Sequence, residues 1–326
     1  MKALQLVHPR IFEMVDVPTP NMNSVSSQQI LVRARWVSLC GSDFSFFNGN
    51  KRYITYPLPT GAPIHESVGV VVESQSQQFQ PGDLVLAIPE GDQGLAEFFV
   101  AQAGKAVHLP EELASCDDSC LIQPLSTVLN AVDQLGDIHA KSIAVIGLGS
   151  IGLFFCWLLK KRGAGHILGI DPNPFRCQVA EKLGANKTNS MRSVEVVHAS
   201  WQEGDQWRQI DICIEAVGHQ TETLNDCIEL VRKQGTVLSF GVPDQPVYPI
   251  EYETFFRKNA ILIAVVTPDW TDYLARARDL YLTNHKELAW LVTHRLPIKD
   301  ATTAFTLYEQ HEENILKAIL DASIWE

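Results

Sequence analysis

The segment IAVIGLGSIG, residues 143–152, joins a short apolar run to three glycines and the beginning of a helix. The apolar run predicts a buried strand, and apolar residues at helical spacing predict a helix over residues 150–163. The first glycine, Gly147, permits a tight turn, Gly149 lets a pyrophosphate approach the backbone, and Gly152 brings the helix close to the strand. The segment therefore predicts a dinucleotide site with the phosphates at the helix N-terminus, rather than a merely structural glycine turn.

An acidic residue stands where such a site needs one. Asp171 ends the next predicted strand, HILGID, 19 residues after Gly152. A carboxylate at this position accepts hydrogen bonds from the adenosine ribose hydroxyls, and it repels the 2′-phosphate of NADP. The sequence therefore predicts NAD rather than NADP as the dinucleotide.

The pattern of predicted elements changes near residue 125 and again near residue 267. Residues 1–124 contain short strands separated by Pro, Gly and polar residues, among them QILVRARWVSL, ESVGVVVES, DLVLAI and AEFFVAQ. In residues 125–267 strands alternate with helices, and SIAVI, HILGID, IDICIEAVG, TVLSFG and ILIAVV are predicted as buried parallel strands. Residues 268–326 begin with the amphipathic helix TDYLARARDLYL and continue as strand, helix and strand. The predicted fold class is α/β, with a mostly-β region first, a doubly wound parallel sheet next and a strand-helix-strand segment last.

Composition limits the partners and the compartment. The 326 residues carry a formal net charge of −12, which argues against nucleic acid or an anionic membrane as a partner. The seven cysteines form no CxxC pair, as expected for thiols in a reducing compartment. The first residues show no secretory signal, and the longest apolar run, IGLFFCWLL, is about half the roughly 20 residues that a membrane span needs. We expect a cytoplasmic globular protein with no nucleic-acid or membrane partner.

Residues 1–124 contain a group of side chains with metal-binding chemistry. Cys40 is in the polar turn LCGSDFSFFNG, residues 39–49, and His65 and Glu66 are adjacent at the start of a predicted strand. Thiolate, imidazole and carboxylate form a donor set suited to zinc, and three protein ligands leave one coordination position open. A lone cysteine or histidine is more often a core or surface residue, so the prediction depends on their occurring together beside a dinucleotide motif.

In these motifs the sequence resembles the zinc-dependent medium-chain dehydrogenase/reductase family, in particular its alcohol and polyol dehydrogenases. The resemblance runs nearly end to end, through CGSD at 40–43, IHESVGVVVE at 64–73, PGDLVLA at 81–87, GLAEFFV at 94–100, QPLSTVLNAV at 123–132, IGLGSIG, DPNPFRCQVAEKLGA at 171–185, EAVG at 215–218, GTVLSFGV at 235–242 and THRLPIKDA. It implies a GroES-like catalytic domain at 1–124, a Rossmann dinucleotide-binding domain at 125–267, and a C-terminal segment at 268–326 that returns to the catalytic domain.

The resemblance implies an enzyme that transfers hydride reversibly between a secondary alcohol and NAD, with one catalytic zinc ion per chain. The substrate class is a polyol, sugar, amino alcohol or related hydroxy compound. Cys40 and His65 would be zinc ligands, and Glu66 a ligand or a carboxylate behind them. Gln123 stands where polyol-type members have a glutamate, and because an amide is a weaker ligand, the third ligand stays open. Zinc would act as a Lewis acid that lowers the pKa of the alcohol.

The proton path departs from the family pattern. Ser42 matches the hydroxyl that contacts the substrate oxygen and begins a proton relay. Family members often end this relay in a histidine three residues on, where this sequence has Ser45, which cannot store a proton near neutral pH. Ile64 replaces the usual glycine before the histidine and is expected to alter the backbone near the metal.

The four-cysteine lobe that binds a second, structural zinc in the family is missing. AIPEGDQ, residues 87–93, stands where it would be inserted, so we expect no second zinc. Cys116 and Cys120 have helical i, i+4 spacing and are expected in the core rather than as replacement ligands.

The resemblance also implies contacts to the dinucleotide from residues of the quoted motifs. They are Gly147, Gly149, Ser150, Ile151, Gly152, Asp171, Arg176, Ala216, Val217 and Gly241. Several aromatic residues either line the substrate pocket or serve packing, namely Phe44, Phe46, Phe47, Tyr53, Tyr56 and Trp270. Lys51 and Arg52 either meet an anionic group of the substrate or lie in a solvated loop.

Two other functions stay open from the sequence. One is a zinc-free reductase of the same superfamily that acts on a ketone or an activated double bond, which a metal assay distinguishes. The other is a non-catalytic dinucleotide-binding protein, which the joint occurrence of Cys40, Ser42 and His65 disfavours.

The family also implies a homodimer or homotetramer, in which the region NAILIAVV, residues 259–266, extends the Rossmann sheet across a two-fold axis. The alternative is that this region is an internal buried strand.

Overall fold

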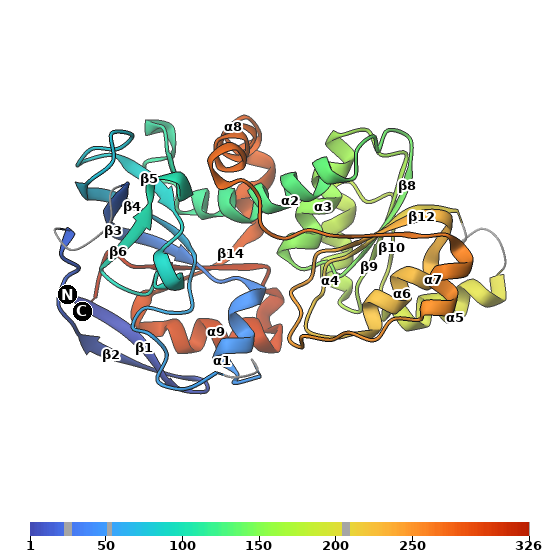
Figure 1. Cartoon of the computed structure of the whole chain (residues 1–326), viewed down its shortest axis with the longest axis horizontal. Coiled ribbons are helices and arrows are strands. Elements are labelled where there is room, and N and C mark those ends of the chain that lie inside the picture. The colour runs from blue at the N-terminus through green and yellow to red at the C-terminus, as the bar shows by residue number, and fades with distance from the viewer. Residues whose placement is uncertain (23–27, 51–53, 204–208, 326) are drawn as a thin grey trace. The chain divides into compact units, whose positions relative to one another are not determined.

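The computed structural model describes residues 1–22, 28–50, 54–203 and 209–325. The chain forms two compact units, one made of Met1–Ser126 with Pro268–Glu326 and the other of Thr127–Thr267. The fold class agrees with the prediction: the first unit is mostly β, and the second is a parallel sheet with helices (Figure 1). Within the described ranges, no helix has both the length and the apolar character needed to cross a bilayer.

A seven-stranded sheet forms the centre of the first unit. Its strands follow the order β14-β15-β3-β4-β5-β7, and β6 also pairs with β3. The bounds are β3 Gln29–Ser38, β4 Glu66–Ser74, β5 Leu84–Ala87, β6 Phe98–Gln102, β7 Ala106–His108, β14 Val292–Pro297 and β15 Lys317–Asp321. A separate hairpin consists of β1 (Lys2–His8) and β2 (Ile11–Asp16). Because β15 pairs with β3, the last strand of the chain lies beside the strand that precedes Cys40.

In the described part of this unit, four α-helices lie wholly or partly within it. They are α1 (Phe44–Phe47), α2 (Ile122–Gln134), which crosses the boundary between the units, α8 (Trp270–Leu288) and α9 (Ala301–Gln310). The aromatic side chains of α1 pack against α9: Phe47 lies 4.8 Å from Phe305 and Phe44 stacks at 4.9 Å on Tyr308, measured between ring centroids. Packing therefore accounts for these two aromatic residues.

The other described residues proposed for the substrate pocket are Phe46, Tyr56 and Trp270. The hydroxyl of Tyr56 donates a hydrogen bond to the carbonyl of Phe46, and Trp270 is the first residue of α8. Lys51, Arg52 and Tyr53 lie outside the described residues.

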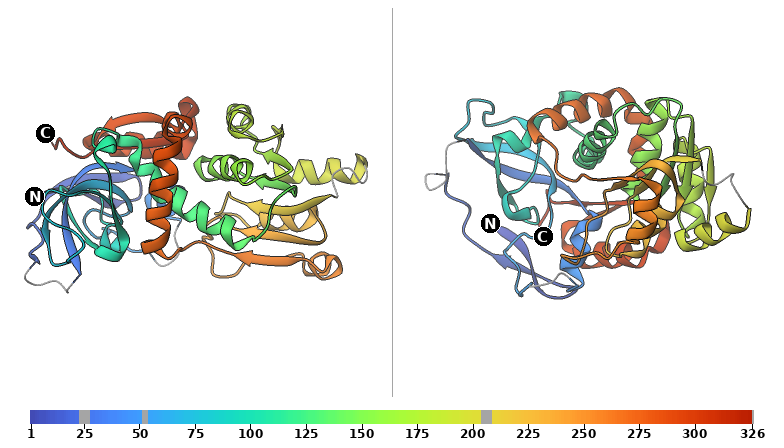
Figure 2. Two further views of the ribbon diagram at one scale, coloured as in Figure 1. Left: turned by 90° about the horizontal axis from the view of Figure 1, so that it is seen from above. Right: turned by 45° about the vertical axis from the view of Figure 1, so that its right-hand side comes forward.

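The second unit contains six parallel strands in the order β10-β9-β8-β11-β12-β13. The strand bounds are β8 Ser142–Ile146, β9 His166–Ile170, β10 Lys187–Asn189, β11 Ile210–Glu215, β12 Val231–Ser239 and β13 Ile261–Ala264. The helix bounds are α3 Ser150–Lys161, α4 Pro174–Leu183, α5 Ser193–Glu203, α6 Glu222–Leu230 and α7 Tyr252–Lys258. The strand order reverses direction between β8 and β11, so right-handed connections put the pair α3 and α4 on one face and the pair α5 and α6 on the other (Figures 1 and 2).

The burial of these strands departs from the prediction at one place. Every residue of β11 from Ile212 to Glu215 is buried, as expected for a strand covered on both faces. The prediction was wrong for β13, where Ile261 is 55% exposed and Leu262 is 37% exposed. β13 is the last strand of the sheet and, among the described strands, pairs with β12 alone. It is therefore an edge strand, as the family resemblance implied, and not the internal strand of the alternative.

Candidate active site

A single buried carboxylate organises the turn that carries Cys40. After β3 the chain enters a short 3-10 turn, Gly41–Asp43, and Asp43 Oδ2 accepts a hydrogen bond from the backbone N–H of Cys40 at 2.8 Å. The other oxygen of Asp43, Oδ1, lies 3.3 Å from Nδ1 of His65. Asp43 thus fixes both the Cys40 backbone and the orientation of the His65 ring. The sequence reasoning did not assign Asp43 a role, although it is the last residue of the quoted CGSD motif.

The predicted ligands Cys40, His65 and Glu66 come together. Each offers one ligand atom, and these atoms lie within 4.8 Å of one another. Burial alone would lower the pKa of His65, but the carboxylate of Asp43 and the thiol of Cys40 raise that pKa well above its usual value. Positive charge is therefore favoured at this position, as a binding site for a divalent cation requires. Sulfur, nitrogen and oxygen donors together suit zinc.

Glu66 is held from behind by a lysine that the sequence did not reveal as part of the site. Lys317, the first residue of β15, and Glu66, the first residue of β4, are both 0% exposed. Lys317 Nζ lies 2.8 Å from Oε1 and 2.6 Å from Oε2 of Glu66, and the hydroxyl of Ser38 donates to Oε2. Burial would lower the pKa of Lys317, yet Glu66 and Cys40 raise it above its usual value, so the lysine stays charged. Strand register explains the meeting, because Ser38 in β3 pairs with Glu66 on one side and with Ile319 of β15 on the other.

The other predicted residues of this site occupy the following positions. Gln123 is buried in the first turn of α2. Ser42 is half-buried in the 3-10 turn, and Ser45 is buried in α1 with its hydroxyl directed at the carbonyl oxygen of Ser42 at 3.4 Å. Ser45 therefore contacts the backbone of Ser42, not its hydroxyl.

Ile64 fits its position because a glycine faces it. Ile64 is fully buried, and its carbonyl accepts a hydrogen bond from the backbone N–H of Gly94 at 3.0 Å. A Cβ at position 94 would lie 2.9 Å from Ile64 Cγ2 and 2.6 Å from the hydroxyl oxygen of Ser67. Gly94 thus leaves the room that the isoleucine side chain occupies.

In the second unit, the glycine segment between β8 and α3 fits a phosphate-binding loop. Gly147 has φ +90°, and a Cβ there would lie 2.6 Å from Val217 Cγ2. A Cβ at Gly152 would lie 1.8 Å from the carbonyl oxygen of Gly147, so helix and loop are in direct contact. Among the described residues, no atom beyond the two chain neighbours lies within 4 Å of where a Cβ on Gly149 would be, and no side chain caps the N-terminus of α3 with a hydrogen bond. Space and backbone N–H groups are therefore present where an anionic phosphate would bind, at the turn from Gly149 into Ser150 and Ile151.

Asp171 lies directly after β9 and contacts the glycine loop. Its Oδ2 accepts a hydrogen bond from the backbone N–H of Leu148 at 2.8 Å, and its Oδ1 accepts one from that of Asn173 at 2.8 Å. Each carboxylate oxygen can accept two hydrogen bonds, so capacity remains for ribose hydroxyls. Arg176 Nη1 lies 3.7 Å from Oδ2 of Asp171, which places a cation beside the predicted ribose position.

The loops after β11 and β12 are joined by a residue that the sequence reasoning did not single out. Oε1 of Glu215 accepts hydrogen bonds from the backbone N–H groups of Val217 at 3.0 Å and Gly218 at 2.9 Å. Oε2 accepts one from the backbone N–H of Gly241 at 3.2 Å. The buried Glu215 carboxylate therefore fixes Ala216, Val217 and Gly241, all predicted to contact the dinucleotide, in one place.

Two family models match successive parts of the chain. The model of the alcohol dehydrogenase GroES-like domain matches residues 26–111, and the model of zinc-binding dehydrogenases matches residues 150–280. Sorbitol dehydrogenase of Bacillus subtilis (strain 168) is 24% identical in an alignment 358 positions long that covers 98% of this chain and 97% of that protein.

Solved structures show the same fold. Alcohol dehydrogenase TADH from Thermus sp. ATN1 superposes with a TM-score of 0.83 at 23% identity, over 98% of this chain and 99% of that chain. A protein from Sinorhizobium meliloti 1021 with bound NADP superposes with a TM-score of 0.80 at 21% identity, over 98% of both chains.

Proposed function

Because the chain belongs to the medium-chain dehydrogenase/reductase family, we propose that it interconverts a secondary alcohol and its ketone with zinc and NAD. It is an alcohol-type oxidoreductase, and its family pairs zinc with a nicotinamide dinucleotide. The substrate class that we propose is a polyol, a sugar, an amino alcohol or a related hydroxy compound.

The convergence of Cys40, His65 and Glu66 carries the proposal. Cys40 and His65 are half-buried, whereas Glu66 is completely buried and bonded to Lys317. We therefore assign Cys40 and His65 as zinc ligands and Glu66 as the carboxylate behind them, which would have to leave Lys317 to bind the ion. The remaining positions then belong to water, Gln123 or the substrate, consistent with the open position of a catalytic zinc.

The protein's own residues hold the reactants and move the proton. Zinc, when bound, lowers the pKa of the alcohol, and NAD accepts the hydride. Ser42 takes the hydroxyl proton of the alcohol, and because Ser42 is half-buried, it passes the proton to water. Ser45 holds the backbone of Ser42 and is not the end of the relay. No histidine is needed in this scheme.

The choice of dinucleotide rests on two residues with opposite effects. Asp171 repels a 2′-phosphate, whereas Arg176, 3.7 Å from it, attracts one. The carboxylate contacts the glycine loop directly through Leu148, so we propose a modest preference for NAD.

A second copy of the chain is the partner that we propose for the edge strand β13. Large apolar side chains are exposed on β13 and on the neighbouring α7: Ile261 at 55% and Phe256 at 65%. An uncovered apolar edge invites non-specific strand pairing, which a two-fold symmetric contact with another β13 prevents. Sedimentation at micromolar concentration tests this, and a monomer would exclude it.

The function is tested by NADH absorbance with a panel of polyols, sugars, amino alcohols and hydroxy acids. We expect turnover of at least one secondary alcohol, and loss of turnover after chelation. Turnover that survives complete zinc removal would favour the zinc-free reductase. Bound zinc and NAD without turnover of any alcohol or ketone would favour the non-catalytic binding protein.

A further inference from the structure

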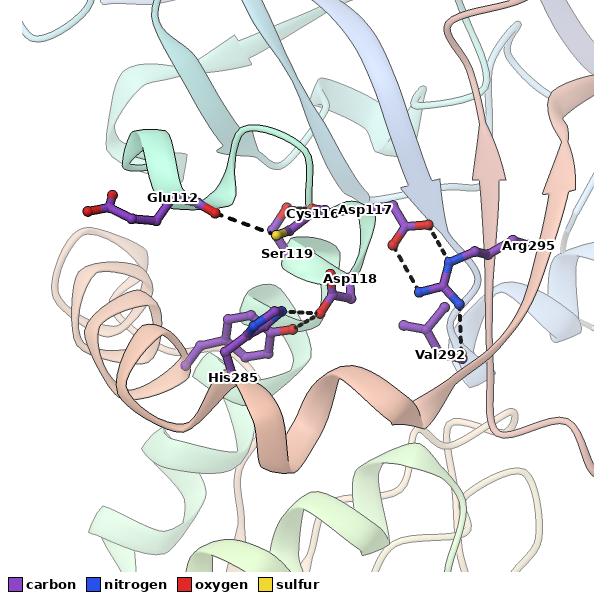
Figure 3. Close-up of polar contacts among 9 residues, drawn as sticks. Glu112, Cys116, Asp117, Asp118, Ser119, His285, Val292 and Arg295 are labelled. Carbon is purple, nitrogen blue, oxygen red and sulfur yellow. Dashed lines mark hydrogen bonds and ion pairs between the residues drawn. The ribbon is translucent and has the colours of Figure 1, made fainter.

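A second cluster with metal-ligating side chains lies in the first unit, apart from the residues of the proposed reaction. Cys116, Asp118 and His285 each offer one ligand atom, and these atoms lie within 4.8 Å of one another. Figure 3 shows the three side chains converging from two elements, the segment around the 3-10 turn Asp117–Leu121 and the last turns of α8. Among the described residues, this cluster and that of Cys40 are the two groups with such an arrangement of Cys, His and carboxylate ligands.

The carboxylate at the centre of the cluster is buried and held in place. Asp118 is 5% exposed, and its Oδ2 accepts a hydrogen bond from the Tyr281 hydroxyl at 2.5 Å and lies 2.6 Å from Nε2 of His285. Tyr281 is 0% exposed and contributes no ligand, so it orients Asp118 in the way that outer hydrogen bonds orient metal ligands. The helix is irregular at Asn284, immediately before His285.

The neighbouring acidic residue is engaged elsewhere. Both oxygens of Asp117 bind Arg295, at 2.5 Å from Nε and 3.0 Å from Nη2 (Figure 3). The sulfur of Cys116 is 3.6 Å from the carbonyl oxygen of Glu112.

We propose that Cys116, Asp118 and His285 bind a zinc ion with a structural role. Thiolate and carboxylate together carry two negative charges, which match the charge of the ion, and sulfur, nitrogen and oxygen donors suit zinc better than calcium or magnesium. A structural zinc site is closed by a fourth protein ligand, and the carbonyl oxygen of Glu112, 3.6 Å from the Cys116 sulfur, would supply it.

The ion would connect segments that are far apart in the sequence. His285 and Asp118 are separated by 167 residues, and a metal that closes so long a loop restricts the unfolded chain strongly. The site would serve in place of the four-cysteine lobe that this chain lacks. It also changes the expectation from the sequence, from one zinc per chain to one catalytic and one structural zinc.

Elemental analysis of the purified protein and three variants tests this directly. We expect about two zinc ions per chain in the unaltered protein, one in Cys40→Ser, one in Cys116→Ser and none in the double variant. Zinc content that is the same with and without Cys116→Ser would overturn the proposal. His285→Gln serves as the second variant if Cys116→Ser does not fold.

Thermal unfolding separates a metal site from a hydrogen-bond network. In the Cys40→Ser background, added zinc should raise Tm by about 5 °C, and the further change Cys116→Ser should abolish this rise. Tyr281→Phe is the comparison variant: it removes a hydrogen bond to Asp118 but no ligand, so it should reduce the zinc-dependent rise without abolishing it. Equal Tm shifts with and without Cys116 would show that Asp118, Tyr281 and His285 form a hydrogen-bond network only.

Discussion

The two Cys, His and carboxylate clusters of the first unit use the same donor types in different settings. In the cluster of Cys40, the carboxylate is neutralised by a lysine: Glu66 and Lys317 are both completely buried. In the cluster of Cys116, the carboxylate of Asp118 accepts a hydrogen bond from the neutral Tyr281 hydroxyl and lies 2.6 Å from Nε2 of His285. Lys317 competes with a metal ion for the carboxylate of Glu66. The Tyr281 hydroxyl is neutral and leaves the negative charge of Asp118 available to a metal ion. Ligand types alone therefore do not tell a catalytic from a structural site; the groups behind the ligands do.

The largest expected effect comes from removing the sulfur of the first cluster. Cys40→Ser should lose the catalytic zinc and lower turnover by roughly 1000-fold or more, since a Lewis acid lowers the activation free energy by several kcal/mol. NAD should still bind, because the glycine loop belongs to the other unit. Zinc content, NADH formation and NAD titration measure the three outcomes. Unchanged turnover in a zinc-free Cys40→Ser protein would remove the cluster from the reaction.

The buried ion pair between Glu66 and Lys317 predicts the largest effect on stability. Lys317→Met leaves Glu66 as a buried, unpaired charge and should lower the free energy of unfolding by about 3–5 kcal/mol. Arg10→Met is the matched control: Arg10 pairs with Glu309 at 2.8 Å, but more than half of the arginine side chain is exposed, so its loss should cost less than about 1 kcal/mol. Denaturant titrations compare the two variants. Equal losses of unfolding free energy in the two variants would mean that burial does not determine how much the Glu66–Lys317 pair contributes to stability.

The neutral partner in the second cluster predicts a smaller loss. Tyr281→Phe removes one hydrogen bond to a buried carboxylate and should lower the free energy of unfolding by about 1.5–3 kcal/mol. The same denaturant titration measures it against Lys317→Met. If Tyr281→Phe lost more free energy of unfolding than Lys317→Met, the charged partner of Glu66 would not be more stabilising than the neutral partner of Asp118.

The smallest expected effect concerns a third carboxylate, in the second unit. Asp171→Asn keeps an acceptor for the N–H of Leu148 but removes the charge that repels a 2′-phosphate, so the ratio of NADP to NAD affinity should rise about tenfold. Fluorescence titrations with both dinucleotides give this ratio. An unchanged ratio, or tighter NADP binding by the unaltered protein, would contradict the role of Asp171.

Local patterns predicted most of the fold and the first cluster. Hydrophobic periodicity and the glycine motif identify β3, β4, β8 and α3, because each depends on residues close together in the sequence. Cys40, His65 and Glu66 were found in the same way, within 27 residues of chain. The burial of β13 was not predicted correctly, because an apolar run does not show whether its strand has one neighbour or two.

Long-range pairs could not be predicted, because they depend on which strands and helices meet. Lys317 reaches Glu66 across 251 residues, through the pairing of β15 with β3. His285 reaches Asp118 across 167 residues, through the packing of α8. Cys116 was therefore assigned to the core from its spacing alone, whereas it is half-buried beside two further potential ligands. The adjacent residues do distinguish the two cysteines: Asp117 and Asp118 follow the half-buried Cys116, whereas Leu121 and Ile122 follow the completely buried Cys120.

Removal and return of zinc tests the central claim most directly. The metal is stripped from the purified protein with a chelator, NAD and an alcohol that the protein oxidises are supplied, and NADH absorbance is followed as zinc is added back. We predict that the metal-free protein is inactive and that turnover returns with zinc in the unaltered chain but not in Cys40→Ser. Full turnover by the metal-free protein would contradict the account.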